Sequence, residues 1–539
     1  MSIRRRDFIK VTTALAAGSA FGADALHDGA AWAQDKGESL LAVLEGAPNS
    51  LDFHVPGANR QVYEVVWNIY DRLLTFGVKK DANGNDYYDV RNLQPELAEE
   101  WDLRDTSVTL KLRKDATFAD GTPVTAKDVK WAFDRTLGVG GYPRSAVAAA
   151  SLVRPDQFVA VDDHTFRVDF VNRDKLSMPY LGVPLVNIYH SELVKKHATP
   201  ADPWGVEWTR LNHAGSGAYK VEKWTPGQEI VYVRNDNWKC GPLPKLKRVI
   251  SRVVPSAGMR RAMIQRGDID VSFDITPKDA AELAADKNVK VVSSLMENTV
   301  QFIGMNVKMK PFDNLKVRQA IAYAMPYQKI IDVALYGRAR PLFGGPDTVT
   351  SAEWPQPHRY MTDPAKAKQL LAEVGYPDGF ETTLSFDLGA AVVNEPLCVL
   401  VQEALGQIGI KVRLDKIAGS NWRAAFTKKT MPIHSQMFGG WFNYPDFYFF
   451  IVYNGTSDTI YNSMDYHNPE MDEAIEAAHY ATDPAVYDRN ARRFIQLAFD
   501  DVPAVPLFQP YLSVALRPNV TGYRYLFHRQ LDYRHMAKV

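Results

Sequence analysis

The segment from Gly439 to Phe450, which reads GGWFNYPDFYFF, gathers seven aromatic rings around one Asn, one Pro and one Asp. Aromatic side chains stabilise protein cores, but they also form flat, rigid walls against which sugars and apolar groups stack. Rings that alternate with polar groups are typical of a pocket wall, because a few hydrogen-bonding groups there orient the ligand. We therefore expect Trp441, Phe442, Asn443, Tyr444 and Asp446 to contact a ligand, and Phe447, Phe449 and Phe450 to belong mainly to the core.

Two other motifs could support catalysis or metal binding. HSELVKKH, from His190 to His197, is the densest cluster of His and Glu, but its spacing does not place two His beside a Glu on one helical face. HAGSG resembles the nucleophile turn of hydrolases, yet Ala214 stands two positions before Ser216, where glycine is required. The chain also has no phosphate-binding Gly-x-x-x-x-Gly-Lys loop. We therefore expect no enzyme activity, no cofactor and no dedicated metal site.

Residues 1–33 have the pattern of an export signal. Arg5 and Arg6 precede a soft run of apolar residues without a basic side chain, and small residues at Ala31 and Ala33 suit signal cleavage. The arginine pair is typical of the twin-arginine route. A membrane-tethering helix is the alternative, but the apolar run is short and rich in Ala and Gly, whereas a spanning helix needs roughly 20 strongly apolar residues.

Length and charge limit the function classes. About 505 of the 539 residues remain after the predicted signal, which is roughly three times a typical domain, so two or more cores are expected. The 63 basic and 63 acidic residues balance, which argues against a nucleic-acid partner. Cys240 and Cys398 are the only thiols, so disulfides cannot be the main support of the fold, whether or not these two pair.

Helices and strands alternate along the chain. In TSVTLKLRKDATF, Val108, Leu110 and Leu112 share one face of a predicted strand. Pro326 divides the helical stretch 313–337 in two, because proline removes a backbone donor and clashes with the preceding turn. Helix starts are indicated at Thr125 with Asp128, at Asp313 or Asn314, and at Asp363 before Pro364, and helix ends at Gly138 and Gly375.

Two segments are expected to cross between lobes. The strand pattern of Asp268–Ile275 ends just before a helix start at Thr276. Near the C-terminus, DDVPAVPLFQP is extended and apolar with three prolines, which suits a rigid strand returning to the first lobe. The chain is therefore predicted to leave one lobe, build a second and return.

Several blocks resemble the extracytoplasmic solute-binding proteins of the peptide/nickel class, family 5, which serve ATP-driven importers. They occur in the family order over nearly the whole mature chain, and as a set they are specific. The blocks are QPELAEEWDL, LRKDATFADGTPVTAKDVKWAFDR, GSGAYKVEKWTPGQEIVYVRNDNW, RRAMIQRGDIDVS, MNVKMKPFDNLKVRQAIAYAM and AKQLLAEVGYPDGF.

The resemblance implies an α/β fold of two hinged lobes, with mixed sheets flanked by helices and an extra subdomain in the first lobe. Ligand is enclosed as the lobes close. On this basis lobe I is expected at 34–275, its inserted subdomain at about 76–212, lobe II at 276–497 and the return to lobe I at 498–539.

The resemblance also suggests which residues face the cleft. Gly46, Ala47 and Pro48 follow the first strand and should line it, and Asn306 and Asp387 end strands of the second lobe. Peptide binders of this class commonly hold the ligand's amino terminus with an Asp shortly after Gly-Trp. Here the first carboxylate after Trp441 is Asp446, beyond Pro445, so the choice between peptide and other cargo depends on whether Asp446 reaches that place.

The expected function is capture of a peptide or peptide-like solute in the periplasm and delivery to a membrane permease, with the ATPase on a separate subunit. An oligosaccharide or an opine-like conjugate is the alternative cargo, and nickel bound through a chelate stays open. An exported hydrolase is the rival class, but no nucleophile and base can be assembled from the sequence. We expect a monomer.

Overall fold

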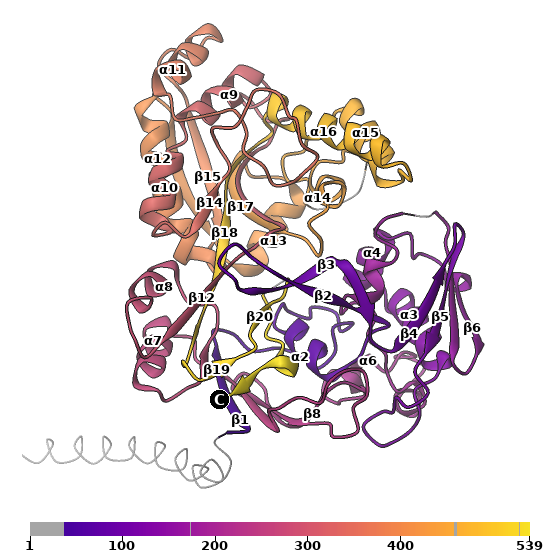
Figure 1. Ribbon diagram of the computed structural model, residues 1–539. Coiled ribbons are helices and arrows are strands. Elements are labelled where there is room, and N and C mark those ends of the chain that lie inside the picture. Colours follow the sequence, from indigo (N-terminus) through magenta and orange to yellow (C-terminus); the bar gives the residue numbers. More distant parts are fainter. Residues whose placement is uncertain (1–36, 173, 457–460, 528) are drawn as a thin grey trace, which may run out of the picture.

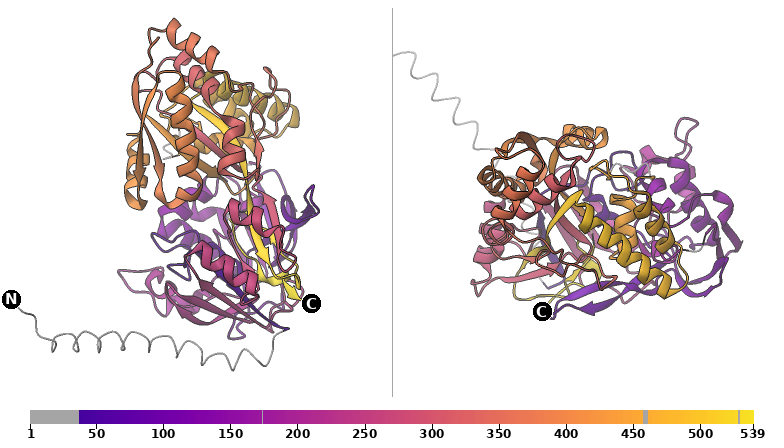
Figure 2. Two further views of the ribbon diagram at one scale, coloured as in Figure 1. Left: turned by 90° about the vertical axis from the view of Figure 1, so that its left-hand side faces the viewer. Right: turned by 90° about the horizontal axis from the view of Figure 1, so that it is seen from above.

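The computed structural model describes residues 37–172, 174–456, 461–527 and 529–539. The predicted signal at 1–33 lies outside them. The chain folds into two lobes that share one long strand, β18 (Figure 1), and Figure 2 shows this yellow strand passing from the orange lobe into the indigo and magenta one.

A mixed sheet runs through both lobes in the order β16-β15-β17-β13-β18-β11-β1-β10-β9-β8, with β12 and β14 also paired to β18. First-lobe strands are β1 (Ser39–Leu44), β8 (Tyr219–Thr225), β9 (Glu229–Arg234), β10 (Arg248–Val253), β11 (Val271–Ser272) and β12 (Lys290–Leu295). Second-lobe strands are β13 (Thr299–Met305), β14 (Ala339–Pro341), β15 (Glu381–Asp387), β16 (Lys411–Ile417) and β17 (Ile433–Gly439), and β18 is Ala504–Leu516.

Strand β18 joins the lobes, as the proline-rich segment predicts. Its first half pairs with β13 and its second half with β12 and β11. The register against β13 shifts beside Pro506, because proline cannot donate to a ladder and is tolerated at such irregularities.

The passage between lobes lies later than the sequence suggests. Helix α8 (Pro277–Leu283) and β12 still pack in the first lobe, where Ile275, Ala280 and Leu283 share one cluster. The chain therefore crosses at 296–298, not after Ile275. On the return, α16 (Pro484–Asp501) and the first half of β18 still belong to the second lobe, so the crossing falls within β18 and not at 498.

The inserted subdomain of the first lobe is a separate four-stranded sheet, β4-β5-β7-β6, covered by α3 (Ala126–Val139). Its strands are β4 (Ala98–Leu103), β5 (Ser107–Leu112), β6 (Phe158–Asp162) and β7 (Thr165–Asp169), and α4 is Gly141–Ala148. Thr125 and Asp128 cap α3 as predicted, but Gly138 does not end it. Gly138 packs under Trp204, and Gly140, at φ 75°, ends the helix instead.

A smaller sheet, β2-β3-β20, lies beside α2 (Val62–Ile69) in the first lobe (Figure 1). Its strands are β2 (Leu74–Lys80), β3 (Asp86–Pro95) and β20 (Arg524–Tyr525). The remaining first-lobe elements are η3 (Pro155–Gln157), η4 (Pro179–Gly182), α5 (Ser191–Lys195), α6 (Val206–Thr209), α7 (Ala257–Arg266), β19 (Val520–Thr521), η6 (Tyr533–His535) and β21 (Ala537–Lys538).

Helices cover the second-lobe sheet. They are α9 (Leu315–Ala324), α10 (Tyr327–Ala334), α11 (Pro364–Glu373), η5 (Leu388–Ala390), α12 (Ala391–Gln407), α13 (Gly419–Lys428), α14 (Pro445–Val452), α15 (Pro469–His479) and α16. Pro326 separates α9 from α10, and Asn314 and Asp363 cap α9 and α11, as predicted.

The stretch Leu388–Gln407, which includes α12, is long and apolar enough to cross a membrane by length and composition alone. Leu397, Cys398 and Val401 on α12 are fully buried in the second-lobe core against β15 and β16. Helix α12 is therefore a core helix of this lobe. Cys398 is a free thiol, as is Cys240 in the first lobe.

Candidate ligand-binding site between the lobes

The aromatic segment 439–450 divides between the two lobes. Gly439 ends β17, the next residues form a loop, and Pro445 starts α14. Trp441 and Phe442, each 2 % exposed, pack into the core cluster of the first lobe, and so does Phe447. Phe449 is buried in the second-lobe core and Phe450 packs on its edge. The segment is thus anchored in the second lobe and inserts rings into the first. Of the three rings that the sequence predicts to be core, Phe447 lies in the first-lobe cluster.

Trp441 lies in a ring cluster supplied by the first lobe. Its ring centre is 4.8 Å from that of Tyr63 on α2 and 5.5 Å from that of Phe527, both edge to face. Its indole nitrogen donates to the Tyr142 hydroxyl at 3.2 Å, and the hydroxyls of Tyr63 and Tyr142 are hydrogen-bonded to each other. Tyr142 remains 43 % exposed, at the edge of the cluster.

The rest of the loop meets polar groups. The Tyr444 ring lies 5.2 Å below the Arg91 guanidinium, which also donates to the Asn443 carbonyl at 3.5 Å. The Asn443 amide donates to Glu297 at 3.4 Å, and Glu297 pairs with Lys79 at 2.9 Å. Phe442 packs on Tyr180 at 5.2 Å between ring centres. A hydrophobic centre with a polar rim results.

Asp446 is not presented to this interface. Its carboxylate is fully buried in the first turn of α14, accepts a hydrogen bond from the Tyr487 hydroxyl at 2.9 Å and lies 3.3 Å from the His479 ring. Both partners belong to the second lobe. The expected contact of Asp446 with ligand is therefore corrected: proline-started α14 turns the side chain inward, where it stabilises its own lobe.

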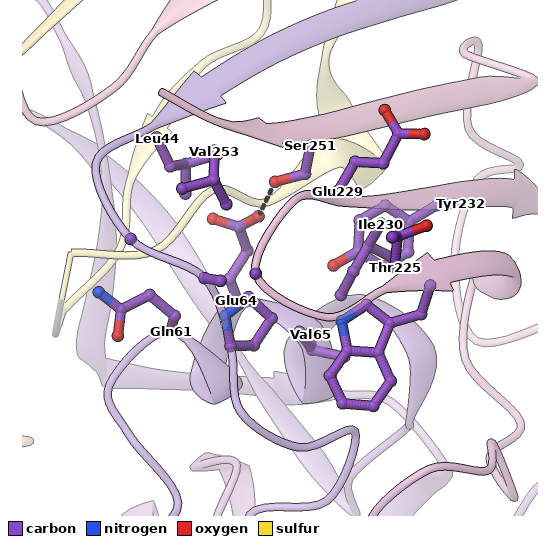
Figure 3. Close-up of a pocket in the computed structure, with 15 residues that line it drawn as sticks. Leu44, Gln61, Glu64, Val65, Thr225, Glu229, Ile230, Tyr232, Ser251 and Val253 are labelled. Carbon is purple, nitrogen blue, oxygen red and sulfur yellow. Dashed lines mark hydrogen bonds between the residues drawn. The ribbon is translucent and has the colours of Figure 1, made fainter. Parts of the chain in front are cut away.

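Gly46, Ala47 and Pro48 belong to the lining of a small cavity in the first lobe. Figure 3 shows this cavity. It lies at the carboxyl ends of β1 and β10, beside the turn between β8 and β9. Glu64 of α2 faces the cavity, is 5 % exposed, and accepts hydrogen bonds from Ser251 at 3.1 Å and Tyr533 at 2.7 Å. Burial raises the pKa of Glu64 to about 7.

The predicted second-lobe contributors lie apart. Thr299 pairs with Gly439 across β13 and β17, so Asn306 lies at the opposite end of β13, roughly 20 Å from that edge. Its amide holds the Lys429 carbonyl at 2.8 Å, and the structure does not bring Asn306 to the interface. Asp387 ends β15 at the same edge of the sheet as Gly439, because β15 and β17 are parallel. Its carboxylate, however, accepts a hydrogen bond from the Gly389 backbone amide at 2.8 Å and so caps its own turn.

A buried ion pair fixes the segment that follows Pro48. Asp52 accepts from Arg135 on α3 and from Tyr189, each at 2.7 Å. Although burial raises it, the pKa of Asp52 is held well below its usual range by Arg135. This pair ties the end of the cavity loop to the inserted subdomain.

The motifs examined for catalysis have structural roles. His190 caps α5, and His197 stacks on Trp208 at 4.3 Å. The Ser216 hydroxyl donates to Asp71 at 2.8 Å, while Gly217 passes so close to the backbone of Ile69 that no side chain would fit. In the described part of the chain, no three His, Cys, Asp or Glu side chains are grouped as a metal site.

Sequence reasoning missed Tyr63, Tyr142, Phe527 and Glu64. One signal was available: Tyr63 and Trp67 lie one helical turn apart on α2, while Gln61, Glu64 and Val65 form its other face. That the first face meets Trp441 and the second lines the cavity depends on contacts between segments far apart in the chain. The hydrophobic periodicity of one helix does not reveal such contacts.

Comparison with known proteins agrees with this architecture. DdpA of Escherichia coli K12, a probable D,D-dipeptide-binding periplasmic protein, is 28% identical over 505 residues, 90% of this chain and 91% of DdpA. The glutathione-binding protein GsiB of Salmonella choleraesuis SC-B67 is 30% identical over 466 residues, 83% of this chain and 85% of GsiB.

The solved structure of AgaA from A. tumefaciens R10, a periplasmic binding protein in complex with agropinic acid, superimposes with a TM-score of 0.76 at 24% identity and covers 93% of this chain and 99% of AgaA. The predicted two-lobe α/β fold is thereby confirmed. Residues 92–459 match the family model described as "Bacterial extracellular solute-binding proteins, family 5 Middle". The chain therefore belongs to the bacterial extracellular solute-binding proteins of family 5, as the sequence blocks indicated.

Proposed function

We propose that this protein is the periplasmic solute-binding subunit of an ATP-binding-cassette importer, and that it captures its solute between the two lobes and passes it to a membrane permease. The observation that carries the proposal is the burial of Trp441, a second-lobe side chain, among Tyr63, Tyr142 and Phe527 of the first lobe. A site built from both lobes is complete only when they close, so ligand and closure stabilise each other.

The proposed cargo is a peptide or peptide-like solute. Two similar proteins are described as binding a D,D-dipeptide and glutathione, which are small, polar and peptide-like. An opine is the second candidate, supported by the fold shared with AgaA in its agropinic acid complex and by the inward position of Asp446. Both classes join apolar and charged groups in one small molecule, which suits a ring cluster with a polar rim.

Binding without chemical conversion is part of the proposal, because the similar proteins are described as binding proteins. Export would follow the twin-arginine route read from the residues around Arg5 and Arg6, and the protein would act as a monomer beside separate permease and ATPase subunits.

A thermal-shift screen tests the cargo class. Dipeptides, glutathione, longer peptides, galactosides and opines would each be added to the purified mature protein. A ligand present at 100 times its Kd adds about 2.7 kcal/mol to the free energy of unfolding, which is a clear rise in Tm. Stabilisation by peptides or glutathione supports the main proposal, and stabilisation by opines alone selects the second. Stabilisation by none of these solutes would reject both.

A further inference from the structure

The first-lobe cavity has the chemistry of a site for a protonated amine. Its walls bring a buried carboxylate, Glu64, together with the rings of Trp224 and Tyr232. Figure 3 labels Glu64 and Tyr232. Carboxylates pair with ammonium groups, and aromatic faces attract cations. The exposed Gly227 and the half-buried segment Gly46–Pro48 lie around the same cavity, so it is open to solvent at this side.

Glu64 is a buried carboxyl without an ion pair. Ser251 and Tyr533 donate to it, but no Lys, Arg or His in the described residues lies within ion-pair distance of it. An isolated buried carboxylate is costly, which is why buried charges are normally paired. A cation entering the cavity would supply the missing partner.

Tyr232 provides a second, independent observation. The residue is fully buried and lines the cavity, yet its hydroxyl has no hydrogen-bond partner among the described residues. In Figure 3 this hydroxyl points to the side of the cavity where Glu64 lies. Buried polar groups are almost always satisfied, so an unpartnered hydroxyl in the cavity wall indicates an occupant that is not part of the chain.

We propose that this cavity is the subsite for a protonated primary amine of the transported solute, with Glu64 as its counter-charge and the Tyr232 hydroxyl as an acceptor. An ammonium group donates three hydrogen bonds and fits beside a carboxylate, a hydroxyl oxygen and an indole face. A solute held against Gly46–Pro48 would extend its amine toward Glu64. The link to the solute depends on the function proposed above, and the cavity itself does not.

Two variants and one control test the site. Glu64→Gln keeps the shape but removes the charge, and Tyr232→Phe removes only the orphaned hydroxyl. Glu222→Gln is the matched control, because Glu222 lies on the neighbouring strand β8, is not part of the cavity lining and is already paired with Arg248. Since the Tyr232 hydroxyl has no partner to lose, Tyr232→Phe should not lower the Tm of the unliganded protein.

The first measurement uses methylammonium chloride against sodium chloride at equal ionic strength, with Tm as the readout. We expect methylammonium to raise the Tm of the wild type and of the Glu222→Gln variant. It should have no effect on Glu64→Gln and a reduced effect on Tyr232→Phe. Equal Tm values in the two salts for the wild type, or an undiminished shift in Glu64→Gln, would overturn the amine site.

The second measurement compares a solute from the screen with its N-acetylated form. We expect acetylation to weaken binding to the wild type at least tenfold and to make no difference to Glu64→Gln. If methylammonium binds but acetylation has no effect, the cavity does not belong to the solute site and the proposal fails. If no solute of either class binds, the proposed function fails, while the methylammonium result still decides whether the cavity takes an amine.

Discussion

The indole nitrogen of Trp441 in the second lobe donates a hydrogen bond to the hydroxyl of Tyr142 in the first lobe, at 3.2 Å. Tyr142 is also hydrogen-bonded to Tyr63, so this hydroxyl links the loop after β17 to α2 and α4. This bond exists only while the lobes are in contact, and it should contribute to ligand affinity more than to the stability of either lobe.

Tyr142→Phe removes that acceptor and keeps the ring. A hydrogen bond contributes about 0.5–1.5 kcal/mol, so we expect the Kd for ligand to rise about 2- to 10-fold, measured by calorimetry. Tyr480→Phe, at a 39 % exposed tyrosine of the second lobe, is the control and should bind normally. An unchanged Kd in Tyr142→Phe would show that the bond is not coupled to binding.

Trp441→Ala should abolish the ligand-induced rise in Tm, because it removes the ring that fills the first-lobe cluster. In the unliganded protein the lobes are expected to open and release Trp441 from the first-lobe cluster. Trp441→Ala should then lower the unfolding free energy by less than about 1 kcal/mol, since neither second-lobe core contains this ring. Trp354→Ala is the matched control. Trp354 is 6 % exposed against Phe449, so its loss should cost about 3–5 kcal/mol without ligand. A similarly large loss for Trp441→Ala, with affinity retained, would make Trp441 a core residue.

Much of this arrangement could be predicted from the sequence, and its limits have a physical reason. Local signals identified the cap at Thr125, the break at Pro326 and the returning strand β18, because capping, proline geometry and alternation act over a few residues. The interleaved polar groups predicted a pocket wall at Trp441–Asp446, and this stays a prediction for the loop, whereas Phe447 lies in the first-lobe cluster. The inward turn of Asp446 could not be read, because it depends on Tyr487 and His479, more than 30 residues away.

Asp446→Ala should lower stability and leave ligand selectivity intact. The change removes the acceptor of the Tyr487 hydroxyl, which is only partly buried, so we expect the loss of one hydrogen bond, about 0.5–1.5 kcal/mol. Urea unfolding of the free protein measures this loss, and the ratio of affinities for a free and an N-acetylated ligand measures selectivity. Wild-type stability with loss of amine selectivity would return Asp446 to the role of an amine anchor.

Lys175→Met should favour the open form. Lys175, from the first lobe, donates to the Ala478 carbonyl at 2.6 Å and lies 3.8 Å above the Tyr487 ring, both in the second lobe. Lys175 is partly exposed, so we expect an effect of about 1 kcal/mol, a roughly fivefold weaker affinity, and a larger radius of gyration by X-ray scattering. Lys368→Met, at an exposed lysine of α11, should change neither. Unaltered scattering and affinity in Lys175→Met would contradict a closing role.

The pH dependence should depend on Glu64. Its pKa is raised by burial from 4.5 to about 7, so the native state binds the proton more tightly than the unfolded chain. Its contribution to stability is therefore full below about pH 4.5 and is lost as the pH rises through 7, by about 3 kcal/mol in all. Glu64→Gln should remove this slope, as urea unfolding between pH 5 and 8 would show.

Amine binding should follow the opposite course. The carboxylate form of Glu64 rises about tenfold in population between pH 6 and 8. The other groups around the cavity keep their charge over this range: they are Arg60, the hydroxyls of Ser251, Tyr232 and Tyr533, and Glu229, whose pKa is lowered by Arg252 although burial raises it. The affinity for methylammonium should rise by up to about tenfold over this range. A pH-independent affinity would exclude Glu64 as the counter-charge.

The most direct test of the account is the fate of a ligand that has bound. The mature wild-type protein and Trp441→Ala would be saturated with a solute from the screen, washed, denatured and analysed by mass spectrometry. We predict one intact solute released per wild-type molecule, able to bind again to fresh protein, and none from Trp441→Ala. Recovery of a converted product, or equal recovery from both proteins, would contradict reversible capture between the lobes.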